Sequence, residues 1–248
     1  MSEFLDIDIG AGSYAQAFRA KNGQYYCSNR ALHADQKICA ILPIPSSLEA
    51  HLTAMRKVHK GNAVRDIKKA QRLGYACSPF VVANHMPDVV SINCSKAVRQ
   101  GRAMTAAYLR TLEERGGAPT VFTPYAPPVY STDFWISVGV FENIPGYLQG
   151  EVAVDRRLWG YITLWRIGEL MIYSQILGHG DRLKDGIMYF LHQYIVEMLT
   201  DQDNPLYSGA RYIMYGPWVS GQRGLRMWKN RTLFQPYYLN LVCSASIE

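Results

Sequence analysis

Two side chains that can move protons flank a glycine in the run Gly178 to Gly186. His179 and Asp181 lie on either side of Gly180. Histidine titrates near neutral pH, so His179 can accept a proton from a reacting group, and Asp181 or Glu151 can serve in its place. The structural alternative is a polar turn residue in a glycine-rich loop. The spacing therefore predicts either a general base or a turn here.

Positive charge is concentrated in the first half of the chain. Residues 1–124 carry a formal charge of +7, whereas residues 125–248 carry −1. Basic residues are crowded between positions 56 and 72, where one acidic residue opposes them: Arg56, Lys57, Lys60, Arg65, Lys68, Lys69 and Arg72. Such a field attracts phosphates of a nucleotide cofactor or of RNA. The run predicts either a phosphate-binding surface or a solvated helix face.

Other motifs of catalysis and cofactor binding are absent or incomplete. The sequence has no G-x-S-x-G, H-E-x-x-H or Walker A motif, which argues against hydrolase, metalloprotease and P-loop chemistry. Five scattered cysteines, none in a C-x-x-C pair, predict reduced thiols and no metal site. Gly10 to Ala15 matches G-x-G-x-x-A, but the following helix and strand are too short for a dinucleotide-binding unit.

The composition is that of an ordinary globular protein. The chain has 248 residues, of which 48% are hydrophobic and 19% are charged. Its apolar runs are far shorter than the roughly 18 residues of a membrane span, and its first residues lack the pattern of a signal peptide. We therefore expect a cytoplasmic protein.

Hydrophobic patterning predicts a mixture of helices and strands. A hairpin is expected over 24–28 and 37–45, followed by a helix over 47–74 that breaks near Gly61. From residue 75 the expected order is strand, two helices, three strands, helix, strand, helix and strand. The expected bounds are 75–80, 85–100, 104–115, 134–142, 158–166, 169–177, 183–199, 210–218, 224–233 and 234–242.

This order, an antiparallel meander followed by a strand–helix–strand crossover, resembles the GNAT acyltransferase superfamily. The resemblance implies an α/β (α+β) fold whose mixed sheet has splayed central parallel strands and flanking helices. It also implies that the splayed strands expose backbone groups to a pantetheine or an aminoacyl ester. A phosphate loop would lie between Gly178 and Gly186, although Leu183 departs from the family's Q/R-x-x-G-x-G/A register.

Two segments narrow the resemblance. RDIKKAQRLGYACSPF (65–80) is similar to the basic helix and strand that open the second domain of the FemAB-type aminoacyltransferases. GLRMWKNRTLFQPYYL (224–239) resembles their C-terminal G-L-x-x-[FW]-K-x-x-x-x-F-x-P pattern. Together with YIMYGPWV (212–219), it also resembles the closing segment of arginyl-tRNA–protein transferases. Both families take their acyl group from aminoacyl-tRNA, which agrees with the basic first half.

The resemblance implies a site with separate catalytic, donor-binding and tRNA-binding parts. Lys229 stands at the family's lysine position, as a cation near the donor's phosphate or the developing oxyanion, and Tyr238 would protonate a leaving group. His179 and Asp181 would accept the amine proton. The donor-binding candidates are Gln175, Gly178, Gly180, Arg182, Lys184 and Gly186, and the tRNA-binding candidates are Lys68, Lys69 and Arg72. The structural alternatives are an exposed helical lysine and a core tyrosine.

The sequence therefore predicts an acyltransferase that moves an aminoacyl group from aminoacyl-tRNA onto an amine of a small molecule or peptide. Residues 1–74 are expected to form an N-terminal extension, a hairpin plus a basic helix, that packs on an acyltransferase domain of residues 75–248. The donor is a co-substrate, and we expect no tightly bound cofactor and no metal. The alternatives are an acyl-CoA-dependent N-acyltransferase and a non-catalytic RNA- or partner-binding protein.

Overall fold

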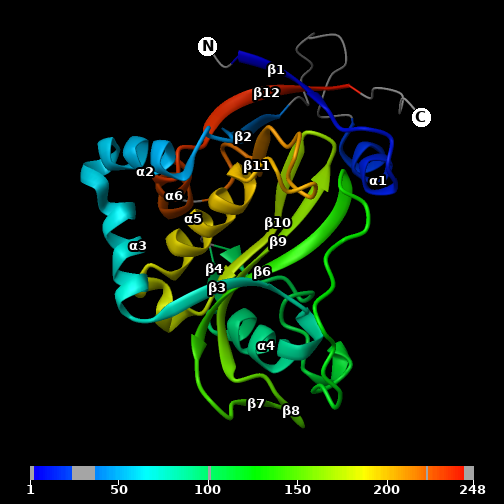
Figure 1. The fold of residues 1–248 in the computed structure, drawn as a ribbon, viewed down its shortest axis with the longest axis vertical. Helices are drawn as coiled ribbons and strands as arrows, with labels where there is room; N and C mark the ends of the chain where they lie inside the picture. Colours follow the sequence, from blue (N-terminus) through cyan, green and yellow to red (C-terminus); the bar gives the residue numbers. More distant parts are fainter. Residues whose placement is uncertain (1–2, 24–36, 100–101, 222, 243–248) are drawn as a thin grey trace.

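The fold is built around one large mixed sheet, which crosses the middle of Figure 1. The computed structural model describes residues 3–23, 37–99, 102–221 and 223–242. The strands of this sheet are β1 (Glu3–Asp8), β2 (Ile38–Pro43), β3 (Tyr75–Phe80), β6 (Asp133–Asn143), β9 (Arg156–Ile167), β10 (Leu170–Gly178), β11 (Tyr212–Pro217) and β12 (Gln235–Val242). They lie in the order β1-β12-β2-β11-β10-β9-β6-β3. Two short hairpins stand apart: β4 (Val98–Arg99) with β5 (Arg102–Ala103), and β7 (Leu148–Gln149) with β8 (Val152–Ala153).

Helices cover both faces of the sheet (Figure 1). One face carries α2 (Leu48–Lys57), α3 (Asn62–Arg72), α5 (Ile187–Thr200) and α6 (Arg223–Arg231). The other face carries α1 (Ser13–Asn22) and α4 (Met86–Cys94). Short 3-10 turns are η2 (His59–Gly61), η3 (Val82–His85), η4 (Glu113–Arg115) and η5 (Gly180–Asp185). Within the described ranges, no helix combines the length and the apolar character needed to cross a bilayer.

Alternation along the central strands explains this two-sided cover. On β9, Ile162 and Leu164 are buried against α5, whereas Tyr161 and Ile167 are buried on the opposite face. A strand that buries both of its faces carries mainly apolar residues, and β9 does so from Leu158 to Trp165, where Thr163 is the one polar residue. The predicted α/β class, with a mixed sheet flanked by helices, is confirmed.

The pattern-based elements agree with the structure except at two expected helices: the helix predicted over 85–100 ends at Cys94, and Val98–Arg99 form the strand β4 instead. The helix predicted over 47–74 is α2 and α3, broken where Gly61 adopts a φ of 69°, and Ser47 caps α2 by accepting the backbone N–H of Ala50 at 3.1 Å. The helix predicted over 104–115 is wrong. This segment folds back on itself, because the Arg115 guanidinium donates to the carbonyls of Ala107 and Tyr108. The strand predicted over 24–28 lies outside the described residues.

The first 74 residues contribute strands to the central sheet. β1 pairs in parallel with β12, and β2 lies between β12 and β11 in antiparallel register with both. Segments from both sides of residue 74 therefore share one sheet. The division into an N-terminal extension of residues 1–74 and an acyltransferase domain of residues 75–248 remains a prediction.

The glycine motif near the N-terminus receives a carboxylate of the protein itself. The backbone N–H groups of Tyr14 and Ala15 donate to the Asp133 carboxylate at 3.0 and 3.1 Å. A Cβ on Gly12 would lie 2.2 Å from the Asp133 side chain, so only glycine permits this approach. The N-terminus of α1 is thus occupied by an internal anion, and the motif has a structural role.

Two neighbouring histidines are buried in the core. The rings of His51 on α2 and His192 on α5 lie 5.3 Å apart, and Nε2 of each ring has no hydrogen-bond partner among the described residues. Nδ1 of His192 pairs with the Tyr173 hydroxyl at 2.9 Å. Burial lowers the pKa of His51 to about 4 and holds the pKa of His192 well below its ordinary value.

These histidines predict acid sensitivity of the fold. In the unfolded chain His51 binds a proton below about pH 6.5, whereas in the folded chain it does so only near pH 4. The free energy of unfolding therefore decreases as the pH is lowered from about 6.5 to about 4. At about 1.4 kcal/mol per pKa unit, His51 contributes on the order of 3 kcal/mol to the loss. Urea melts at pH 7 and pH 5 should show a smaller loss for His51→Gln than for the wild type. The exposed His59→Gln is the matched control, and equal losses in all three proteins would contradict the prediction.

Candidate active site

The two central parallel strands separate along their length. β10 and β11 pair only from Leu170 to Ile172, opposite Tyr212 to Met214. Beyond this point β10 continues on β9, and β11 continues on β2. The backbone edge of β10 that faces β11 therefore has no strand partner from Tyr173 onward. The predicted splay of the central strands is confirmed.

A β-bulge marks the start of the gap. The register of β10 against β9 shifts between Tyr173 and Gln175, so Ser174 is an extra residue. The shift reverses the faces of the following side chains. Leu177 packs toward α4, and Ile176 packs toward α5. No feature of the sequence indicates the bulge.

A cavity of about 480 Å³ lies between the splayed end of β10 and α5, and we call it the α5-side cavity. Its wall is mainly aromatic and aliphatic, with two basic side chains. The lining residues that the argument uses are Lys96, Arg99, Tyr189, Tyr215, Leu225 and Trp228. The rings of Tyr189 and Trp228 lie nearly parallel, with centroids 6.4 Å apart. Such a wall suits a flat apolar ring that is attached to an anionic group.

Two further cavities continue this one to the opposite face of the sheet. The central cavity, about 290 Å³, includes Ser174, Gln175 and Gly216 in its wall and shares Arg99, Ile176, Tyr215 and Leu225 with the α5-side cavity. The α4-side cavity, about 310 Å³, shares Tyr108 and Gln175 with the central cavity. The shared walls place the three cavities side by side through the gap between β10 and β11.

The described walls of these cavities carry positive charge and no carboxylate. Lys96, Arg99 and Arg115 line them, and no Asp, Glu or His does so among the described residues. Arg99 donates to the carbonyl of Gly178 at 3.0 Å, which fixes the end of β10. Burial lowers the pKa of Arg99, but a guanidinium remains protonated at neutral pH. The walls therefore favour a ligand with negative charge.

Lys229 is enclosed beside the gap. Its side chain has no exposed surface, which excludes the solvated-lysine alternative. Nζ donates to the carbonyl of Pro217 at 2.6 Å and lies 3.2 Å from Oγ of Ser220 and 3.4 Å from the carbonyl of Trp218. Burial lowers the pKa of Lys229 to about 8. Lys229 thus joins α6 to the splayed end of β11, and it does not line the described cavities.

His179 and Asp181 lie at the end of β10 but do not line the three cavities. The His179 ring packs edge-on against Trp159, and Nδ1 accepts the backbone N–H of Asp181 at 3.4 Å. Burial is the main cause that lowers the pKa of His179, and the Asp181 carboxylate, 3.9 Å away, opposes it. The Asp181 side chain is 86% exposed. This geometry matches the polar-turn alternative.

The amides of the predicted phosphate loop have partners within the protein. These contacts are Gly180 N–H with Oγ of Ser95, Arg182 N–H with the carbonyl of His179, and Gly186 N–H with the carbonyl of Leu183. Gly186 has a φ of 82°, and a Cβ there would lie 2.2 Å from the carbonyl oxygen of Asp66 on α3. The glycine is therefore required for the packing of α3 against η5.

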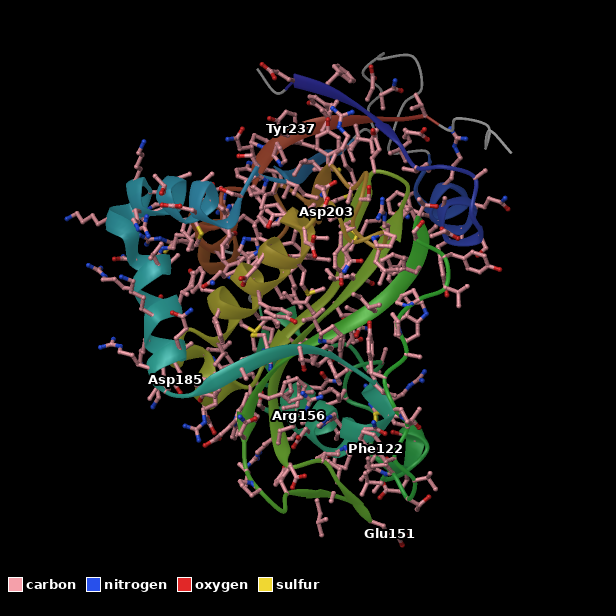
Figure 2. The ribbon with its side chains drawn as sticks, viewed as in Figure 1. Phe122, Glu151, Arg156, Asp185, Asp203 and Tyr237 are labelled. Atoms are coloured by element: carbon pink, nitrogen blue, oxygen red, sulfur yellow. The ribbon has the colours of Figure 1, made fainter. Side chains whose placement is uncertain are left out.

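The predicted tRNA-binding and donor-binding cations lie close together. Nζ of Lys69 donates to the carbonyl of Lys184 at 2.8 Å and lies 3.3 Å from the Asp185 carboxylate, which Figure 2 labels near the end of α3. Arg182 lies 3.8 Å from the same carboxylate. Lys68, Arg72 and Lys184 are exposed, so α3 and η5 present one basic surface beside the α5-side cavity.

The structure brings some predicted residues to the gap and leaves others apart. Gln175 and Gly178 line the cavities. Tyr238 lies on β12, two strands away from β11, where it stacks on Phe4 at 5.3 Å. Sequence reasoning missed the lining residues Arg99, Tyr108, Arg115, Tyr189 and Tyr215. Tyr215 stood in the quoted motif YIMYGPWV and Trp228 in GLRMWKNRTLFQPYYL, but neither motif marked these side chains as cavity wall.

Comparison with known proteins gives a likeness of fold. The sequence matches no known family profile and no curated protein. The structure resembles a crystal structure of FemX with a TM-score of 0.54 and 8% identity, covering 94% of this chain and 68% of that one. A functionally unknown conserved protein from Staphylococcus epidermidis matches with a TM-score of 0.41 and 10% identity, covering 90% of this chain and 74% of the other.

Proposed function

We propose that this protein is an acyltransferase that moves an aminoacyl group from aminoacyl-tRNA to an amine. The observation that carries the proposal is the gap between β10 and β11, where cavities from both faces of the sheet meet. Two substrates can approach from opposite faces and bring their reacting atoms together there, which is most of what aminolysis of an ester requires. The FemX-like fold and the segments that resemble FemAB-type transferases support the same reaction class.

The α5-side cavity suits the donor's terminal aminoacyl-adenosine. Tyr189 and Trp228 offer flat surfaces for stacking of an adenine ring. Lys96 and Arg99 stand where phosphate or ribose oxygens need cations. The acyl carbonyl would then reach the central cavity, where unpaired backbone N–H groups of β10 can stabilise the oxyanion.

The described walls offer no carboxylate or imidazole that could act as a base. The acceptor amine must therefore arrive in its neutral form, and the nearby cations favour that form because they repel an ammonium ion. Its nitrogen bonds to the acyl carbon, the ester carbon–oxygen bond breaks, and the leaving ribose oxygen takes up the proton that the amine releases.

The loop between β10 and α5 favours a tRNA donor over coenzyme A. Pyrophosphate binding by loop amides requires free N–H groups, and several of those in η5 already have partners. The exposed cations on α3 and η5 suit a larger polyanion.

The direct test offers charged tRNA or acyl-CoA together with hydroxylamine, a small amine that traps an activated acyl group as hydroxamate. We expect the protein to accelerate hydroxamate formation from aminoacyl-tRNA and not from acyl-CoA. Acceleration from acyl-CoA alone would favour the thioester alternative. Donor binding without acceleration would favour a non-catalytic RNA-binding protein.

Reversal of charge on α3 should weaken donor binding. Lys68→Glu with Arg72→Glu changes two exposed side chains, and each lost phosphate contact lowers the salt dependence of binding by about one counterion. We expect at least a tenfold higher Kd for tRNA at about 0.1 M salt and an unchanged urea midpoint. Lys21→Glu, which reverses the charge of an exposed lysine on α1, is the control. Lys69 stays unchanged in the test because its contacts with Asp185 and Lys184 hold η5.

A further inference from the structure

We infer that the α4-side cavity binds the acceptor, and that the acceptor is an amine that also carries a carboxylate. This inference rests on the proposed function and adds the substrate class. The cavity, about 310 Å³, lies on the sheet face opposite the α5-side cavity and meets the central cavity at Gln175 and Tyr108. An acceptor held there can direct its amine into the gap from the side that the donor does not occupy.

Hydrogen-bonding groups give this cavity a defined polar wall. Asn93 lines it and is almost fully buried, with 1% exposure. Its amide oxygen accepts the Tyr161 hydroxyl at 2.9 Å, so its amide nitrogen is the group left to donate. Thr163 lies in the same wall, with its hydroxyl 3.2 Å from that of Ser137. Ordinary apolar packing under α4 would not require this set of groups.

Arg115 supplies the charge of the cavity. Its Nε and Nη2 donate to carbonyls of the 107–110 segment, so the guanidinium is held in place while Nη1 has no such contact. Nη1 can therefore donate a charge-assisted hydrogen bond to a carboxylate of the ligand. Because no described wall residue carries negative charge, a carboxylate is the group on the ligand that balances Arg115.

The test measures transfer from aminoacyl-tRNA to a mixture of dipeptides with free C-terminal carboxylates, and separately to the matching dipeptide amides. We expect the wild type to acylate the carboxylate mixture at least tenfold faster. Arg115→Gln should raise KM for that mixture at least tenfold and change the rate with the amides by less than twofold. Arg110→Gln, which alters an exposed arginine of the same segment, is the matched control.

Two further measurements are needed. One distinguishes the effect of the Arg115 charge from an effect on the folding of its segment, and the other distinguishes failure of this inference from failure of the proposed function. Arg115→Lys keeps the charge and should recover most of the carboxylate preference, even where Arg115→Gln loosens the segment. Hydroxamate formation reports donor activation without a carboxylate-bearing acceptor and should be unchanged in the Arg110→Gln control. Equal rates with both mixtures, or no transfer to either while hydroxamate still forms, would overturn this inference alone. Loss of hydroxamate formation in the wild type would instead overturn the proposed function.

Discussion

Lys229→Met is expected to lower both the stability of the protein and its rate of transfer. Lys229 has no exposed surface, and Nζ holds the carbonyl of Pro217 at 2.6 Å. Methionine fills much of the same space but leaves this buried acceptor unpaired, which costs about 1–3 kcal/mol. The resemblance predicts a lysine that contacts the donor and whose loss spares the fold. Because Lys229 is buried, we instead expect its substitution to lower both the free energy of unfolding and the rate of transfer.

The effect on rate follows from what Lys229 positions. Pro217 and Ser220 continue the splayed end of β11, and Tyr215 and Gly216 of that end form the wall of the central cavity. A displacement of about 1 Å at reacting groups lowers a rate roughly a hundredfold, and we expect a loss of this order in single-turnover hydroxamate formation.

An experiment can distinguish a purely structural role of Lys229 from a role in positioning the wall of the central cavity. Lys57→Met, at an exposed position of α2, is the control and should change neither measurement. The assay runs at a temperature where Lys229→Met remains folded by circular dichroism. Full activity of the folded variant would show that Lys229 only stabilises the structure.

The sequence predicts the fold well where its signal is local. The break near Gly61 in the helix expected over 47–74 and the strands expected over 134–142, 158–166 and 169–177 follow from local patterning and appear in the structure. The prediction of a helix over 104–115 is wrong because a side-chain contact, which the local pattern does not record, decides the conformation there. Its residues favour a helix, but the Arg115 side chain competes for their carbonyl groups.

The candidate site is less predictable because it depends on separations that no local pattern records. The gap arises from where β10 and β11 cease to pair, and the bulge at Ser174 reverses the faces that follow it. Arg99 and Tyr215 meet at the gap although 116 positions separate them in sequence. The resemblance located the strands correctly and placed Gln175 and Gly178 in the walls, but it did not reveal that the loop amides have internal partners.

Ser174→Trp is expected to abolish transfer and leave donor binding intact. Ser174 is exposed, lies at the bulge and lines only the central cavity, so an indole there occupies the space where the two substrates would meet. The core does not change, so the free energy of unfolding measured by a urea melt should change by no more than about half a kcal/mol, as for ordinary surface substitutions.

The readouts for Ser174→Trp are single-turnover hydroxamate formation and the thermal shift produced by charged tRNA. We expect the rate to fall at least a hundredfold, because the indole excludes the amine from the acyl carbon. The thermal shift should persist, because the α5-side cavity and the basic surface of α3 and η5 are untouched. Thr53→Trp places the same side chain at an exposed position on α2 and should leave both readouts unchanged. Transfer at the wild-type rate in Ser174→Trp would mean that the acyl group reacts outside the gap between β10 and β11.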